Sequence, residues 1–119
     1  MIYNQLVMRP EGLDAVFSAL SDPHRRHMVE RLARRPMTVG EVAEGLPISQ
    51  PAASKHVKIL ERSGLISRAV RGRVHVLQLT PQAMRTASVW METQRRYWLG
   101  ALERLDAYFE TNDDKEQQP

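Results

Sequence analysis

The stretch SQPAASKHVKIL at residues 49–60 constrains the fold of this chain more than any other. Ser49 suits a helix N-cap, and Pro51 suits the first helical turn. Apolar residues recur at helical spacing, at Ala53, Val57 and Leu60, which predicts a helix that packs by one face. The opposite face offers amide, hydroxyl and ammonium groups and no carboxylate: Gln50, Ser54, Lys55 and Lys58. Such groups hydrogen-bond base edges and phosphates in a DNA major groove.

The flanking segments predict what surrounds this helix. Thr38 can cap a short helix over residues 39–44, which Gly45 and Pro47 would end. Two helices and a tight turn at this spacing predict a helix-turn-helix over residues 38–63. After a C-cap at Gly64, residues 65–70 and 74–79 read as two strands of a hairpin. A hairpin at 65–79, behind a recognition helix, is a wing.

The charge of the chain is concentrated in the same region. The net charge of the whole chain is only +3, yet residues 49–75 hold six basic residues and one acidic residue. Arg71 and Arg73 flank Gly72 at the expected tip of the wing, where a wing meets the phosphate backbone or the minor groove. A solvated helix face beside a solvated hairpin is the alternative explanation. The candidate DNA-binding residues are Ser49, Gln50, Pro51, Ser54, Lys55, His56, Lys58, Arg68, Arg71 and Arg73.

Four motifs resemble the ArsR-type winged helix-turn-helix repressors: SDPHRR at 21–26, TVGEVA at 38–43, the run at 49–60, and SGLI at 63–66. The resemblance extends from about Leu13 to the end of the last helix. It implies a mainly α fold with a small β-hairpin, flanked by N- and C-terminal dimerisation helices. It also implies a sequence-specific regulator of transcription. We expect a repressor that binds double-stranded DNA at an inverted repeat as a homodimer, in a single domain over residues 1–110.

Two apolar surfaces are expected to form the dimer interface. Leu13, Val16, Phe17 and Leu20 share one helical face near the start of the chain. Residues 81–110 predict a long helix whose apolar stripe is too large for one small core to cover. Its candidate interface residues are Trp90, Met91, Trp98, Leu102, Leu105 and Phe109. The aromatic residues of the stripe leave a ligand pocket open as the alternative.

The histidines admit several interpretations. His24 and His27 are spaced i, i+3, which suits a pair of metal ligands. The simpler interpretation is that both are ordinary histidines, solvated or hydrogen-bonded, without a metal. The run from Trp90 to Leu105 is similar to a metal-independent branch of the ArsR family, and we expect neither metal nor cofactor. His56 either contacts DNA or is held against the preceding helix by one ring nitrogen. His75 is expected to face phosphate or solvent.

Composition narrows the remaining function classes. The sequence has no cysteine, which excludes disulfides and thiolate metal sites. No apolar run approaches the roughly 18 residues of a membrane span, and we expect a cytoplasmic protein. Neither a glycine-rich phosphate loop nor a catalytic His/carboxylate motif is present, so an enzyme is not expected. A winged-helix module for protein interaction is the alternative function. Residues 1–9 are expected to be a loosely held arm and 111–119 a disordered tail, and the sequence does not identify an effector.

Overall fold

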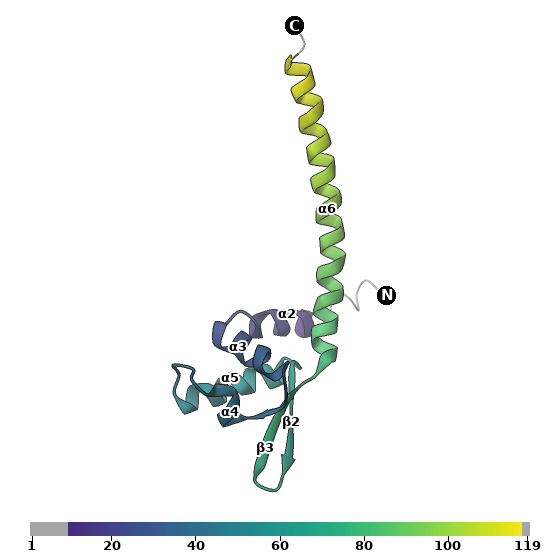
Figure 1. Cartoon of the computed structure of the whole chain (residues 1–119). Coiled ribbons are helices and arrows are strands. Elements are labelled where there is room, and N and C mark those ends of the chain that lie inside the picture. Colours follow the sequence, from purple (N-terminus) through teal and green to yellow (C-terminus); the bar gives the residue numbers. More distant parts are fainter. Residues whose placement is uncertain (1–9, 118–119) are drawn as a thin grey trace. The chain divides into compact units, whose positions relative to one another are not determined.

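The computed structural model describes residues 10–117 of the chain, which divides into a first unit that ends at Ala87 and a second that begins at Ser88. The arm expected at residues 1–9 lies outside the described residues. Figure 1 shows the elements in order: α2 (Pro10–Ala19), α3 (Pro23–Leu32), β1 (Met37–Thr38), α4 (Val39–Ala43), α5 (Gln50–Arg62), β2 (Ile66–Arg71), β3 (Val74–Leu79) and α6 (Pro81–Gln117). The predicted mainly helical winged helix-turn-helix is confirmed.

The three strands form one antiparallel sheet in the order β1-β3-β2. Strands β2 and β3 pair from Ile66 opposite Leu79 to Arg71 opposite Val74. Strand β1 adds Met37 opposite Leu77 on the other edge of β3. The sequence predicts the hairpin alone, because two residues are too few to show the alternating pattern of a strand.

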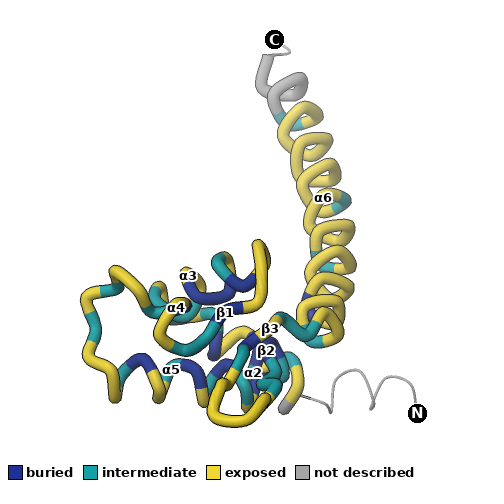
Figure 2. Tube along the Cα trace, turned by 60° about the horizontal axis from the view of Figure 1, so that its bottom comes forward, coloured by how far each residue is buried: buried dark blue, intermediate teal, exposed yellow. Residues whose placement is uncertain are grey.

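The core of the first unit lies where its helices meet the base of the hairpin. Leu60 of α5, Leu77 of β3 and Leu65 between α5 and β2 are at most 1% exposed. Figure 2 shows buried segments along α5 and at the base of the strands, while the outer hairpin is exposed. Helix α3 contributes a buried stripe of Met28, Val29 and Leu32. The hairpin is thus anchored at its base, and its tip projects beyond the core.

Helix α6 continues past its expected end near Glu110, as far as Gln117. The disordered tail expected at 111–119 is therefore wrong for its helical part, and residues 118–119 lie outside the described residues. The sequence has no glycine or proline between residues 101 and 117. Polar composition alone does not end a helix when no breaker is present.

Candidate nucleic-acid interface

Helix α5 presents one polar face and buries the other. The Ser49 hydroxyl accepts a hydrogen bond from the Ala52 amide at 3.2 Å, which caps the helix as predicted. The buried face consists of Ala53, Val57 and Leu60, each at most 3% exposed. The opposite face is exposed at each residue that the sequence proposes for DNA contact: Gln50, Pro51, Ser54, Lys55 and Lys58. This face offers donors and acceptors without a carboxylate.

Helix α4 is fixed at both ends by local chemistry. The Thr38 hydroxyl accepts from the Glu41 amide at 3.2 Å, and the Glu41 carboxylate accepts from the Thr38 amide at 3.0 Å. This reciprocal capping and the hydrogen bond from Arg35 hold the pKa of Glu41 below its ordinary value. Beyond α4, Gly45 adopts a φ of +79°, in the left-handed region where glycine is favoured. The chain can then reverse into α5.

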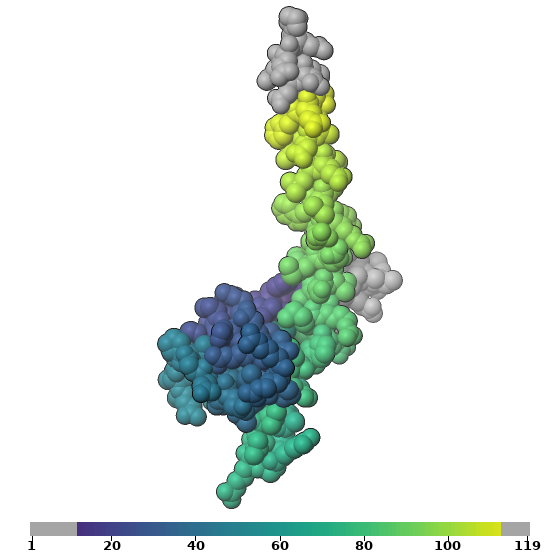
Figure 3. Space-filling model, in the orientation of Figure 1, coloured from purple at the N-terminus to yellow at the C-terminus, as the bar shows by residue number. Residues whose placement is uncertain are grey.

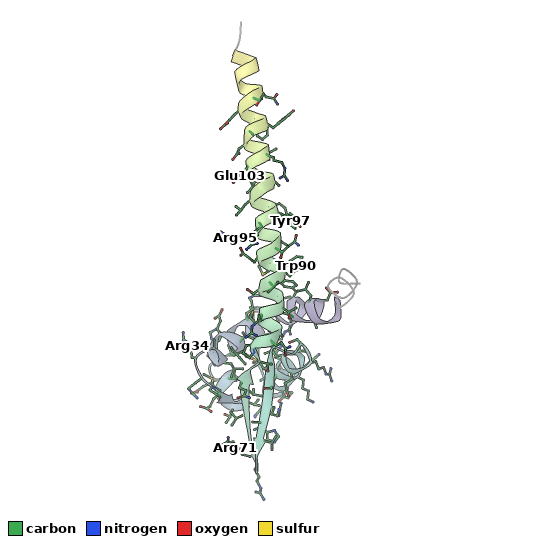
Figure 4. All side chains as sticks on the ribbon, turned by 90° about the vertical axis from the view of Figure 1, so that its right-hand side faces the viewer. Arg34, Arg71, Trp90, Arg95, Tyr97 and Glu103 are labelled. Atoms are coloured by element: carbon green, nitrogen blue, oxygen red, sulfur yellow. The ribbon has the colours of Figure 1, made fainter. Side chains whose placement is uncertain are left out.

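The hairpin ends in a tight turn with two exposed arginines. Arg71 pairs with Val74, so Gly72 and Arg73 form a two-residue turn. Gly72 has a φ of +64° at the first central position, as in the type II′ turns of hairpins. Figure 3 shows the hairpin as a narrow projection, and Figure 4 shows Arg71 near its end. Both arginine side chains are exposed.

Arg68 differs from the other predicted DNA contacts because it is engaged within the chain. Its Nη2 and Nε donate to the two carboxylate oxygens of Glu61 at 2.6 and 3.3 Å. Its Nη1 lies 3.1 Å from Nδ1 of His75, which is exposed as expected. Each guanidinium nitrogen of Arg68 thus has a partner on α5 or β3. The candidate role of Arg68 in DNA binding stays a prediction.

His56 is held in place from α3. Its Nδ1 lies 3.0 Å from Nη1 of Arg25, whose other nitrogens donate to the carbonyls of Ala19 and Ser18. His56 is half-buried. The structural alternative for this histidine therefore describes its position better than DNA contact, although its partner lies on α3 and not on α4. The sequence gives no sign of this partner, because Arg25 is distant along the chain.

The arrangement of His24 and His27 offers little to a metal ion. The ring of His24 lies 6.1 Å from the ring of His56, whereas His27 lies 3.9 Å from the carboxylate of Glu30. Within the part of the chain that the structure describes, no three His, Cys, Asp or Glu side chains gather as metal ligands would. Asp22 serves as the N-cap of α3 and accepts from the amides of His24 and Arg25.

A shallow hollow of about 440 Å³ lies between the start of α4 and the wing. Its basic lining comes from Arg68, Arg73 and His75, and the other lining residues are Thr38, Val39, Gly40 and Val74. The helix-turn-helix and the wing thus border a common surface with three basic side chains. Sequence reasoning assigned no role to Glu61 or to the start of α4 here. The sequence feature that could have indicated a role for Glu61 is its position as a single acidic residue among basic ones.

The two proposed interface surfaces differ in exposure. On α2, Val16 is 2% exposed and belongs to the core of its own unit, so it offers a partner almost no surface. Phe17 is 36% exposed, while Leu13 and Leu20 pack partly against the core. On α6, the side chains predicted for the interface are 44–68% exposed: Trp90, Met91, Trp98, Leu102, Leu105 and Phe109. Figure 4 shows Trp90 and Tyr97 on one side of this helix.

No helix in the described range is both long and apolar enough to cross a membrane.

Known proteins are similar to this chain in sequence and in fold. Residues 20–68 match the model of a helix-turn-helix domain family. The chain is 39% identical over 89 residues to the HTH-type transcriptional regulator Rv2034 of Mycobacterium tuberculosis, covering 75% of this chain and 80% of that protein. It is 34% identical over 79 residues to the transcriptional repressor SdpR of Bacillus subtilis, covering 66% of this chain and 88% of that protein.

Solved structures of transcriptional regulators also resemble this chain in fold. A crystal structure of an ArsR family transcriptional regulator matches with a TM-score of 0.70 and 36% identity, covering 75% of this chain and 92% of that one. An ArsR-like transcriptional regulator from Rhodococcus sp. RHA1 matches with a TM-score of 0.68 and 26% identity, over 82% of this chain and 92% of that one. These are regulators and not enzymes. The chain therefore belongs to the ArsR family of winged helix-turn-helix, DNA-binding transcriptional regulators.

Proposed function

We propose that this protein is a repressor that binds an inverted-repeat operator as a homodimer. The observation that carries the proposal is the exposed face of α5, which has hydrogen-bonding side chains and no carboxylate, beside a wing with two exposed arginines at its tip. Binding over a promoter would block polymerase. The name of SdpR as a transcriptional repressor supports this direction of regulation. Such a protein acts where the DNA is, which for a bacterial regulator is the cytoplasm.

The side chains of the interface divide into two roles. Gln50 and Ser54 stand on the exposed face of α5 and suit hydrogen bonds to base edges, which discriminate sequence. Lys55, Lys58 and the wing arginines suit phosphates, which add affinity without sequence information. Ser49 is already the N-cap acceptor of α5, and its hydroxyl can also donate to a phosphate.

A dimer accounts for the exposed apolar side chains of α6. Half-exposed tryptophan, leucine and phenylalanine side chains along one stripe are typical of a surface that a partner covers. A two-fold axis would place two α5 helices in successive major grooves, about 34 Å apart. The aromatic part of the stripe keeps a ligand pocket as the alternative use of this surface.

We assign the protein to the members of the family that act without a metal. In metal-sensing relatives the usual cysteines lie on the helix that corresponds to α4, and Val39–Ala43 carries none. An effector of other chemistry is compatible with this assignment.

The test is selection of bound duplexes from a random pool by the purified protein, followed by titration at two salt concentrations. An enriched inverted repeat with half-sites one helical turn apart is the expected result. Salt-sensitive binding without enrichment would contradict the operator, and no binding would favour the protein-interaction module. Arg34→Ala is the control for substitutions of the wing arginines, because Arg34 is also exposed and lies away from the hairpin end that carries Arg71 (Figure 4).

A further inference from the structure

The outer half of the wing has little apolar packing to hold it. Beyond Leu77, which is fully buried, Ala69 and Val76 are half-buried, and the apolar side chains nearest the tip, Val70 and Val74, are 56% and 51% exposed. An isolated two-stranded hairpin is at best marginally stable in water. Some other interaction must therefore restrain the wing if Arg71 and Arg73 are to keep a fixed position beside α5.

Arg68 occupies the position where such a restraint would act. It pairs with Leu77 across the hairpin, so its side chain shares the face of the sheet that turns toward the core. Glu61, in the last turn of α5, receives two hydrogen bonds from it. The side chains of Arg68 and Glu61 are only 27% and 29% exposed, which shields the pair from solvent. His75 connects the same guanidinium to β3, so both strands of the wing are included.

We propose that Glu61 and Arg68 are positioning residues, which fix the wing relative to the recognition helix, and that Arg68 does not itself bind phosphate. Glu61 is the single acidic residue between residues 49 and 75. By charge alone, a carboxylate beside a polyanion weakens binding. Here the carboxylate is neutralised by Arg68, and its geometric role outweighs the unfavourable charge. The proposal rests on the proposed contact of the wing with DNA.

The two roles considered for Arg68 predict opposite effects of Glu61→Gln on the affinity for DNA. If Arg68 bound phosphate, Glu61→Gln would release it from its competitor and strengthen binding. If the pair positions the wing, Glu61→Gln removes the charge-assisted hydrogen bonds and weakens binding by about tenfold, as expected for a bidentate pair shielded from solvent. Glu44→Gln is the matched control, since Glu44 is an exposed carboxylate at the end of α4 and loses the same charge.

The experiment titrates one duplex, taken from the random-pool selection, with wild-type protein and five variants. These are Glu61→Gln, Glu44→Gln, Arg68→Ala, Arg73→Ala and the Arg68→Ala/Arg73→Ala double variant. The salt dependence of binding is measured for each. We expect Arg73→Ala to reduce the salt slope by about one in the wild-type background, and by much less once Arg68 is absent. If Arg68 only stabilised the fold, Arg68→Ala would lower the melting temperature, but Arg73→Ala would still reduce the salt slope by the same amount in that background.

Each result supports or overturns the proposal. Binding by Glu61→Gln that equals or exceeds wild-type binding would overturn it, as would an equal effect of Arg73→Ala in both backgrounds. If Arg73→Ala changes neither affinity nor salt slope, the proposed contact of the wing fails, and the positioning role fails with it. If Arg73→Ala weakens binding while Glu61→Gln does not, only the positioning role fails. Thermal unfolding of Glu61→Gln, the isosteric variant, verifies that the first unit remains folded.

Discussion

Replacing Leu102 with glutamate tests the proposed dimer interface most directly. Leu102 is 51% exposed on α6, so about half of its side chain is available to a partner. Burying a whole leucine side chain is worth about 1.5–3 kcal/mol, so the exposed half contributes about 1 kcal/mol in each protomer. A two-fold interface counts this contribution twice. Leu102→Ala should therefore cost about 2 kcal/mol, which raises the dimer dissociation constant about thirtyfold.

Glutamate adds a second cost to the loss of apolar contact. Each carboxylate that loses water in the interface costs at least about 2 kcal/mol, unless a cation compensates it. For two protomers the sum reaches about 6 kcal/mol, which raises the dissociation constant roughly ten-thousandfold. For a wild-type dissociation constant of about 1 nM or more, Leu102→Glu should then be monomeric at micromolar concentration. It should also bind half-sites poorly, because the two recognition helices are no longer linked.

Sedimentation equilibrium over a range of protein concentrations measures this effect. Ala107→Glu is the matched control, because this substitution introduces the same charge on the same helix. Ala107 is exposed, and it lies five residues after Leu102, which places it about 140° from Leu102 around the helix axis. Circular dichroism of each variant verifies that α6 remains helical. A Leu102→Glu protein with the wild-type dissociation constant, or a disruptive effect of Ala107→Glu of equal size, would refute this interface.

Three further predictions concern recognition and stability. Gln50→Ala should lose discrimination at particular bases in a competition assay, whereas Arg73→Ala should weaken binding to every duplex and flatten the salt slope; equal losses on all duplexes for both would contradict the division of roles. Partial burial acts to raise the pKa of Asp22, but hydrogen bonds from the amides of Arg25 and His24 hold it below its ordinary 3.8. Ionised Asp22 therefore stabilises the fold above that pH, and this contribution falls as pH drops through its folded value. Urea unfolding should find wild type more stable than Asp22→Asn at pH 7, with a difference that shrinks on acidification; a constant difference would refute the linkage. Leu60→Ala, at a fully buried position, should lower the free energy of unfolding by about 2–5 kcal/mol in the same assay, and a loss below 1 kcal/mol would contradict the packing of α5.

The helix-turn-helix was predictable because local chemistry specifies it. Thr38, Ser49 and Asp22 are cap residues whose hydroxyl or carboxylate groups accept the first free amides of the helices that follow them. Glycines at residues 45 and 72 adopt positive φ at the turns. The period of the apolar residues then identifies which face of α5 is buried. Each of these signals lies within a few residues of the structure that it specifies.

Other features depend on residues distant in sequence. Strand β1 exists because Met37 meets Leu77, and a two-residue strand carries no pattern of its own. Helix α6 extends beyond its predicted end because a polar segment without breakers is compatible with both helix and coil.

The family, the exposed polar face of α5 and the basic character of the wing follow from the sequence, because caps, glycines and apolar period act locally. Which polar side chains are engaged within the chain depends on the packing of distant elements. It pairs Arg68 with Glu61 and His56 with Arg25, and it buries Val16 in the core of its own unit. The physical reason is that a charge or a hydrogen-bond donor is available to DNA only if no nearer partner satisfies it. That partner is set by the packing of α3, α5 and the hairpin, which spacing along the chain does not reveal.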